Sequence, residues 1–137
     1  MSRKTARDIL YKLVFEYIFT GEVNERTQGM LLLDATLTPD DKEYINKCYA
    51  GVAEKREELS ALIMKFAVGY SSADRLVKGD LVAMLISAYE LSYMPDIPSG
   101  VSINEAVELV KQYSTDKSSG FVNGVLASIN KEVRGNG

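Results

Sequence analysis

Cations and aromatic rings share one stripe of the first predicted helix, and the residues of this stripe are suited to binding a single strand. Helical periodicity predicts this helix at residues 3–19. At 100° per residue, five side chains fall within a sector about 120° wide: Arg3, Lys4, Arg7, Tyr11 and Phe15. Cations neutralise phosphates and flat rings stack on bases. The alternative is that Tyr11 and Phe15 widen the apolar core and that the cations are only solvated.

The sequence lacks the residue patterns that carry out catalysis in common enzyme folds. It contains no histidine, which removes the commonest general base and metal ligand. Glycine-rich phosphate loops, a GxSxG turn, and CxxC or HExxH motifs are also absent from the sequence. Paired carboxylates such as Asp40 and Asp41 stand at helix starts, where the helix dipole explains them. We therefore expect a binding protein that is not an enzyme, with no cofactor and no metal.

Composition favours one soluble domain over residues 1–137, with 46% hydrophobic and 26% charged residues. The chain carries 16 basic and 19 acidic residues, a net charge of −3, so nucleic-acid binding would depend on a local patch. The single cysteine, Cys48, is expected to be a small core residue. No apolar run approaches the ~18 residues of a membrane span, and no signal peptide is evident, so we expect a cytoplasmic protein.

The remaining elements are also predicted to be helical, giving an all-α fold of about six or seven helices. The segment 25–37 is expected to hold a short helix, around Met30–Leu33. A long helix is predicted from Pro39 to about Phe66, with Thr38 as its N-cap. Residues 72–76 read as one helical turn, and the apolar segment 81–93 reads as a central helix.

The segment 101–129 is predicted to be a hairpin of two helices. Ser102 and Glu105 have the spacing of a capping box, so the first helix is expected to begin there. The polar residues 115–120 interrupt the helical pattern, and a second apolar series begins at Phe121. The tail from Arg134 to the C-terminus is expected to fray.

Two motifs in this hairpin resemble the signature of NusB-type transcription antitermination factors: NEAVEL at residues 104–109 and FVNGVL at residues 121–126. The resemblance covers nearly the whole chain and is dense from about Leu76 to Ile129. It implies an all-helical single domain that binds boxA-type RNA of ribosomal RNA leaders. The implied partner is a small-subunit ribosomal protein, NusE, and the pair joins other Nus factors on RNA polymerase.

The resemblance also implies which residues do the binding. RNA contacts fall on Arg3, Lys4, Arg7 and Phe15 of the stripe, which Tyr11 extends, and on the loop residues Lys117, Ser118, Ser119, Gly120 and Phe121. Partner contacts fall on Asp74 and Asp80, for which capping of a helix start is the alternative. Asn104 and Asn123 are expected to satisfy backbone groups of the hairpin.

The sequence departs from the family pattern at three places. Only three cations stand at the start of the first helix, Phe15 replaces a frequent tyrosine, and Ser119 and Gly120 occupy a position that is often basic. These differences predict weaker RNA contact or a greater dependence on the partner. Two other functions stay open: a homo-oligomeric helical scaffold, or a NusB-like targeting module of an RNA-modifying enzyme, although 137 residues leave no room for a methyltransferase domain.

Overall fold

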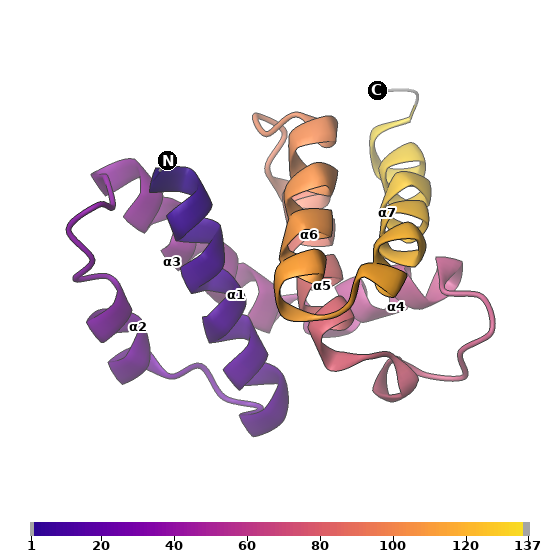
Figure 1. Cartoon of the computed structure of the whole chain (residues 1–137), viewed down its shortest axis with the longest axis horizontal. Coiled ribbons are helices and arrows are strands. Elements are labelled where there is room, and N and C mark those ends of the chain that lie inside the picture. The colour runs from indigo at the N-terminus through magenta and orange to yellow at the C-terminus, as the bar shows by residue number, and fades with distance from the viewer. Residues whose placement is uncertain (1, 136–137) are drawn as a thin grey trace. The chain divides into compact units, whose positions relative to one another are not determined.

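The structure is a computed structural model that describes residues 2–135. Within these residues every regular element is helical, comprising seven α-helices and two 3-10 turns (Figure 1). The prediction of an all-α fold with six or seven helices is confirmed. Contacts divide the chain into two compact units, Met1–Glu54 and Lys55–Gly137. The single-domain expectation stays a prediction.

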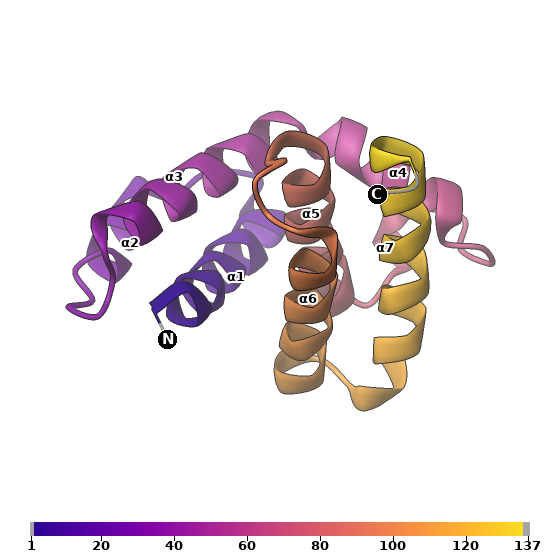
Figure 2. The ribbon, with the colours of Figure 1, turned by 90° about the horizontal axis from the view of Figure 1, so that it is seen from above.

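The first unit contains helices α1 (Ser2–Thr20), α2 (Glu25–Leu31) and α3 (Pro39–Glu54). Figure 2 shows α1 lying along α3, and the two helices bury a common apolar core. Gly21 ends α1 as predicted, because its φ of +77° lies in the left-handed region that favours glycine. The short helix α2 begins earlier than expected, where the side chain of Asn24 accepts a hydrogen bond from the Thr27 N–H at 3.0 Å.

The prediction of one helix from Pro39 to Phe66 is wrong. The backbone leaves helical geometry at Lys55, with φ −102° and ψ 15°, and a separate helix α4 (Arg56–Phe66) follows. The apolar spacing continues across this break and no glycine or proline marks it, so periodicity alone does not reveal it. Cys48 on α3 is buried, which confirms its assignment to the core.

The second unit is built around α5 (Lys78–Tyr93), in which every residue from Gly79 to Leu91 is buried. Helices α4, α6 (Ser99–Tyr113) and α7 (Ser119–Arg134) pack against it, and Figure 2 shows α6 and α7 side by side. The central position predicted for this apolar helix is confirmed. Two 3-10 turns complete the unit: η1 at Ala73–Arg75, as predicted for residues 72–76, and η2 at Asp116–Ser118.

The predicted capping box at Ser102 is also wrong. Helix α6 begins at Ser99, directly after Pro98, and the Ser102 N–H donates to the Pro98 carbonyl at 3.0 Å as an ordinary helical bond. The Ser102 hydroxyl is buried and lies 2.8 Å from the Ser87 hydroxyl of α5. Ser102 therefore joins two helices instead of starting one.

The expectation that the tail frays is wrong for Arg134. Its guanidinium donates to four carbonyl oxygens and one hydroxyl at 2.8–3.2 Å: those of Glu90, Leu91, Met94, Ile97 and Ser99. These carbonyls belong to the end of α5 and the loop that follows it, and those of Glu90 and Met94 also accept backbone N–H groups, from Met94 and Ile97. Arg134 thus anchors the end of α7, whereas residues 136–137 lie outside the described residues.

Candidate nucleic-acid interface

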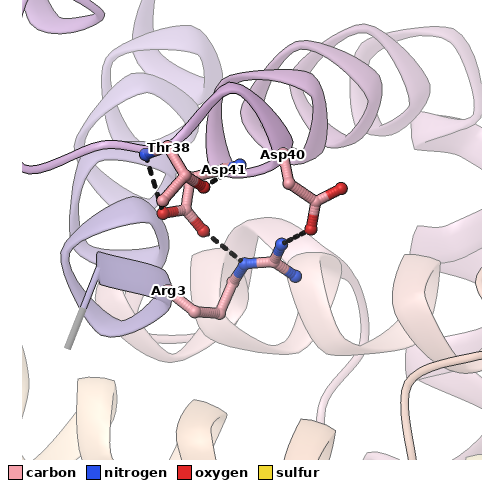
Figure 3. A network of polar contacts seen from close by, with 4 residues as sticks. All are labelled: Arg3, Thr38, Asp40 and Asp41. Atoms are coloured by element: carbon pink, nitrogen blue, oxygen red, sulfur yellow. Dashed lines mark hydrogen bonds and ion pairs between the residues drawn. The ribbon is translucent and has the colours of Figure 1, made fainter.

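Arg3 of the predicted stripe is held by two carboxylates at the start of α3 (Figure 3). Its Nε donates to Asp41 at 2.9 Å and its Nη2 donates to Asp40 at 3.0 Å. Asp41 also accepts from the Thr38 N–H at 3.2 Å, while the Thr38 hydroxyl accepts from the Asp41 N–H at 3.1 Å. Thr38 is therefore the N-cap, as predicted. Because Arg3 is bound to both carboxylates, its first role is to join α1 to α3.

For Arg7 and Tyr11, the structure corrects the expectation of a binding surface, because both side chains are buried. Arg7 is only 5% exposed, and its guanidinium lies 5.4 Å from the centre of the Tyr44 ring. Arg3 lies over the same ring at 4.5 Å, so one aromatic side chain of α3 receives both cations. Tyr11 faces the core, as the alternative interpretation held for this residue.

The surface that α1 does expose contains two lysines and two phenylalanines. At 100° per residue, Lys4, Phe15, Phe19 and Lys12 fall within a sector of about 80°. Asp8 lies in the same sector, and its carboxylate pairs with the Lys12 ammonium at 3.1 Å. Phe15 is 36% exposed, Phe19 is 62% exposed, and their ring centres lie 5.2 Å apart. We call these four residues the α1 face. Lys12 and Phe19 were missed because the stripe was centred on Arg7, and their common angular sector was the signal that could have found them.

The predicted loop contacts gather at the start of α7, in the second unit. Lys117 and Gly120 are exposed, while Ser118, Ser119 and Phe121 are half-buried. Two hydrogen bonds order this turn: Lys117 N–H donates to the Thr115 hydroxyl at 3.2 Å, and the Ser119 hydroxyl donates to the Asp116 carbonyl at 2.8 Å. The turn is therefore a defined structure that presents a cation, a glycine and an aromatic ring.

Of the two predicted partner residues, only Asp74 is exposed; it lies in η1. Asp80 in the first turn of α5 is buried, and its carboxylate accepts from the Ser114 hydroxyl at 2.7 Å. This burial corrects the expectation that Asp80 faces a partner, because the side chain joins the start of α5 to the end of α6. Asn104 and Asn123 are exposed, and their side chains make no hydrogen bond to the described residues, contrary to expectation.

The described part of the chain has no candidate for a membrane span or a metal site. No helix there is long and apolar enough to cross a membrane. No group of three acidic, cysteine or histidine residues among residues 2–135 could hold a metal ion. The fold and its surfaces thus define a class: an all-helical protein that presents exposed aromatic rings beside lysines.

Comparison with known proteins assigns the family. The chain belongs to the NusB family, whose model matches residues 1–131. The transcription antitermination protein NusB of Ruminiclostridium cellulolyticum is 40% identical over 131 residues, covering 96% of this chain and 90% of that protein. The resemblance carried by NEAVEL and FVNGVL is therefore confirmed.

Solved structures of the family share the fold. NusB of T. maritima matches with a TM-score of 0.83 and 30% identity, covering 96% of this chain and 92% of that one. A chain in the crystal structure of antitermination factors NusB and NusE in complex with dsRNA matches with a TM-score of 0.83 and 28% identity. That match covers 96% of this chain and 97% of the other.

Proposed function

We propose that this chain is a transcription antitermination factor that binds boxA-type RNA of ribosomal RNA leaders together with the small-subunit ribosomal protein NusE. The observation that carries the proposal is the match, over 96% of the chain, to a protein in a structure of NusB and NusE with RNA. The pair would then join other Nus factors on RNA polymerase. Because bacterial transcription takes place in the cytoplasm, we assign the protein's action to that compartment.

The RNA surface that we propose differs from the stripe predicted by sequence. In the first unit, the α1 face supplies two rings for base stacking and two lysines for phosphates. In the second unit, the α7 turn presents Lys117, Gly120 and Phe121 as a separate set of candidate contacts. Arg3 supports the α1 face through its bonds to Asp40 and Asp41 of α3, and Arg7 does so through the Tyr44 ring. The two arginines thus act on RNA binding mainly by holding α1 in place.

The proposed ribosomal partner is needed to supply positive charge for RNA binding. The chain has a net charge of −3, and two of its three N-terminal cations are engaged with α3, which leaves a weak field for attracting RNA. A basic ribosomal protein would supply the missing phosphate contacts. On this chain Asp74 is exposed and can face such a partner, whereas Asp80 stabilises the start of α5.

The proposal is tested by fluorescence anisotropy with a labelled boxA-like RNA and a scrambled RNA of the same length, each titrated with the chain, with NusE and with both. We expect tight, sequence-dependent binding only when both proteins are present. Light scattering on the same samples gives the composition of the complex. A homo-oligomer that neither recruits NusE nor distinguishes the two RNAs would favour the scaffold alternative and contradict the proposal.

A further inference from the structure

A second aromatic pair lies in the unit formed by residues 55–137, where Tyr70 contacts Phe121 of the α7 turn described above. Tyr70 follows Gly69 in the connection between α4 and η1, and its ring lies 5.4 Å from the ring of Phe121 with an interplanar angle of 49°. Tyr70 is still 42% exposed with Phe121 beside it. Its hydroxyl has no hydrogen-bond partner among the described residues, so no polar contact accounts for the ring's position.

The surroundings of this pair are open and carry charges of both signs. Gly120 precedes Phe121, and a side-chain Cβ at this glycine would meet no atom within 4 Å. The first turn of α7 contains no acidic residue and has no side-chain cap. Lys117 in the preceding turn and Arg75 in η1 are both exposed, and each follows an exposed acidic residue, Asp116 and Asp74. A nucleotide could therefore approach the backbone closely, with its phosphate near a lysine and the positive end of a helix.

We propose that Tyr70 and Phe121 form a base-stacking platform, in which an unpaired RNA base stacks on the exposed ring of Tyr70. The proposal rests on the RNA-binding function proposed above, and it adds a residue that the sequence motifs do not contain. Phe121 supports the Tyr70 ring and fixes its orientation, which lowers the entropy lost when a base stacks on it. Stacking tolerates any base because each has a flat face. The platform therefore strengthens binding without selecting sequence.

The first experiment uses the absence of tryptophan from this chain. In the complex with the ribosomal partner, Tyr70→Trp introduces a fluorescent ring at the platform, and the unsubstituted complex serves as the blank. We expect its emission to fall as boxA-like RNA is added. The control is Val133→Trp, at the exposed far end of α7, about 18 Å along the helix from Phe121 at 1.5 Å per residue. Emission that changes equally at both positions, or at neither, would overturn the proposal.

The second experiment measures affinity and separates the ring from other roles. We expect Tyr70→Leu to weaken RNA binding by the heterodimer about 5- to 150-fold, and Tyr70→Phe to bind like the unchanged protein, because the ring stacks and the hydroxyl does not. Partner affinity without RNA should stay constant. If Tyr70→Leu weakens partner binding instead, the surface belongs to a protein contact and the proposal is wrong.

Phe15→Leu, measured in parallel, keeps the two proposals distinguishable. If Phe15→Leu weakens RNA binding and Tyr70→Leu does not, the platform is wrong while the proposed function stands. If the unchanged heterodimer does not bind the RNA, both are wrong. If Tyr70→Leu also lowers the melting temperature, its loss of affinity could come from misfolding. The change in Tyr70→Trp emission on adding RNA then decides whether a base stacks on this ring.

Discussion

At the level of single residues, the sequence indicates chemical type well but burial poorly. Arg3 and Arg7 were expected among the RNA contacts, yet both guanidinium groups lie over Tyr44. The side of α1 that faces α3 depends on contacts with Tyr44, which is 37 positions after Arg7 in the sequence. No local sequence pattern predicts a contact over this distance. The two rings of the stripe divide between the two interpretations. Phe15 is partly exposed, as binding to a single strand requires, whereas Tyr11 is buried and widens the core.

The two carboxylates that hold Arg3 should differ sharply in their effect on stability. Asp41 is buried and accepts from both Arg3 and the Thr38 N–H, so we expect Asp41→Ala to lower the free energy of unfolding by about 2–3 kcal/mol. Asp40 is 85% exposed, and Asp40→Ala should cost less than about 1 kcal/mol. Chemical denaturation of both variants measures this. Equal losses would show that the network in Figure 3 does not stabilise the protein as described.

The buried phenol of Tyr49 should make the first unit sensitive to alkali. Burial raises the pKa of Tyr49 above its ordinary value of 10.0, the Asn24 N–H opposes this by donating to the hydroxyl, and the charge of Glu16 adds to the rise. The folded state therefore favours the neutral phenol. Its contribution to stability is complete below pH 10 and is lost as the pH rises through the raised pKa.

The comparison of Tyr49→Phe with the unchanged protein tests this effect. At pH 8 the variant should be less stable by about 1 kcal/mol, because the Asn24 N–H loses its acceptor. Above pH 10 this difference should shrink, since the variant has no phenol to ionise at this position. Denaturation at a series of pH values between 8 and 11 provides the measurement. A difference that stays constant across the series would contradict the assignment.

At the level of helices, elements with a clear apolar period were predicted to within one to three residues, and boundaries set by tertiary contacts were not. α1 and α5 follow from their spacing, and α3 begins directly after its N-cap Thr38 because the cap chemistry is local. The break at Lys55 and the start of α6 depend on packing between helices. At α6 the same serine that looks like a cap in sequence bonds to α5, and only the fold can distinguish these roles.

The bond between Ser87 and Ser102 gives the element-level prediction. Ser102→Ala should cost about 1–2 kcal/mol, because the Ser87 hydroxyl is left buried without its partner. The double variant Ser87→Ala with Ser102→Ala should recover part of this loss. Thermal denaturation of the single and double variants forms the cycle. Strictly additive losses would instead support a capping role for Ser102, which does not involve Ser87.

At the level of the whole molecule, the all-α class could be predicted from helical periodicity and the family from two short motifs, while the binding surface required the structure. The chain is acidic overall, so its affinity for RNA cannot come from a general attraction. Binding must depend on a few groups that the fold leaves exposed, of which Lys4, Lys12, Phe15 and Phe19 form the α1 face. Lysines contribute to RNA affinity by neutralising phosphates, which depends on salt, whereas rings contribute by stacking on bases, which does not. The salt dependence of the affinity therefore distinguishes the two contributions.

The most direct test is the salt dependence of RNA binding by the heterodimer, measured by anisotropy with boxA-like RNA. We expect Lys12→Ala to reduce the slope of log affinity against log salt by about 0.7, the value for one phosphate of a single strand. Phe15→Ala should leave the slope unchanged and cost about 1–3 kcal/mol. Lys47→Ala, exposed on α3, is the control and should change neither. If Lys12→Ala and Phe15→Ala both bind like the unchanged protein, the α1 face does not contact RNA.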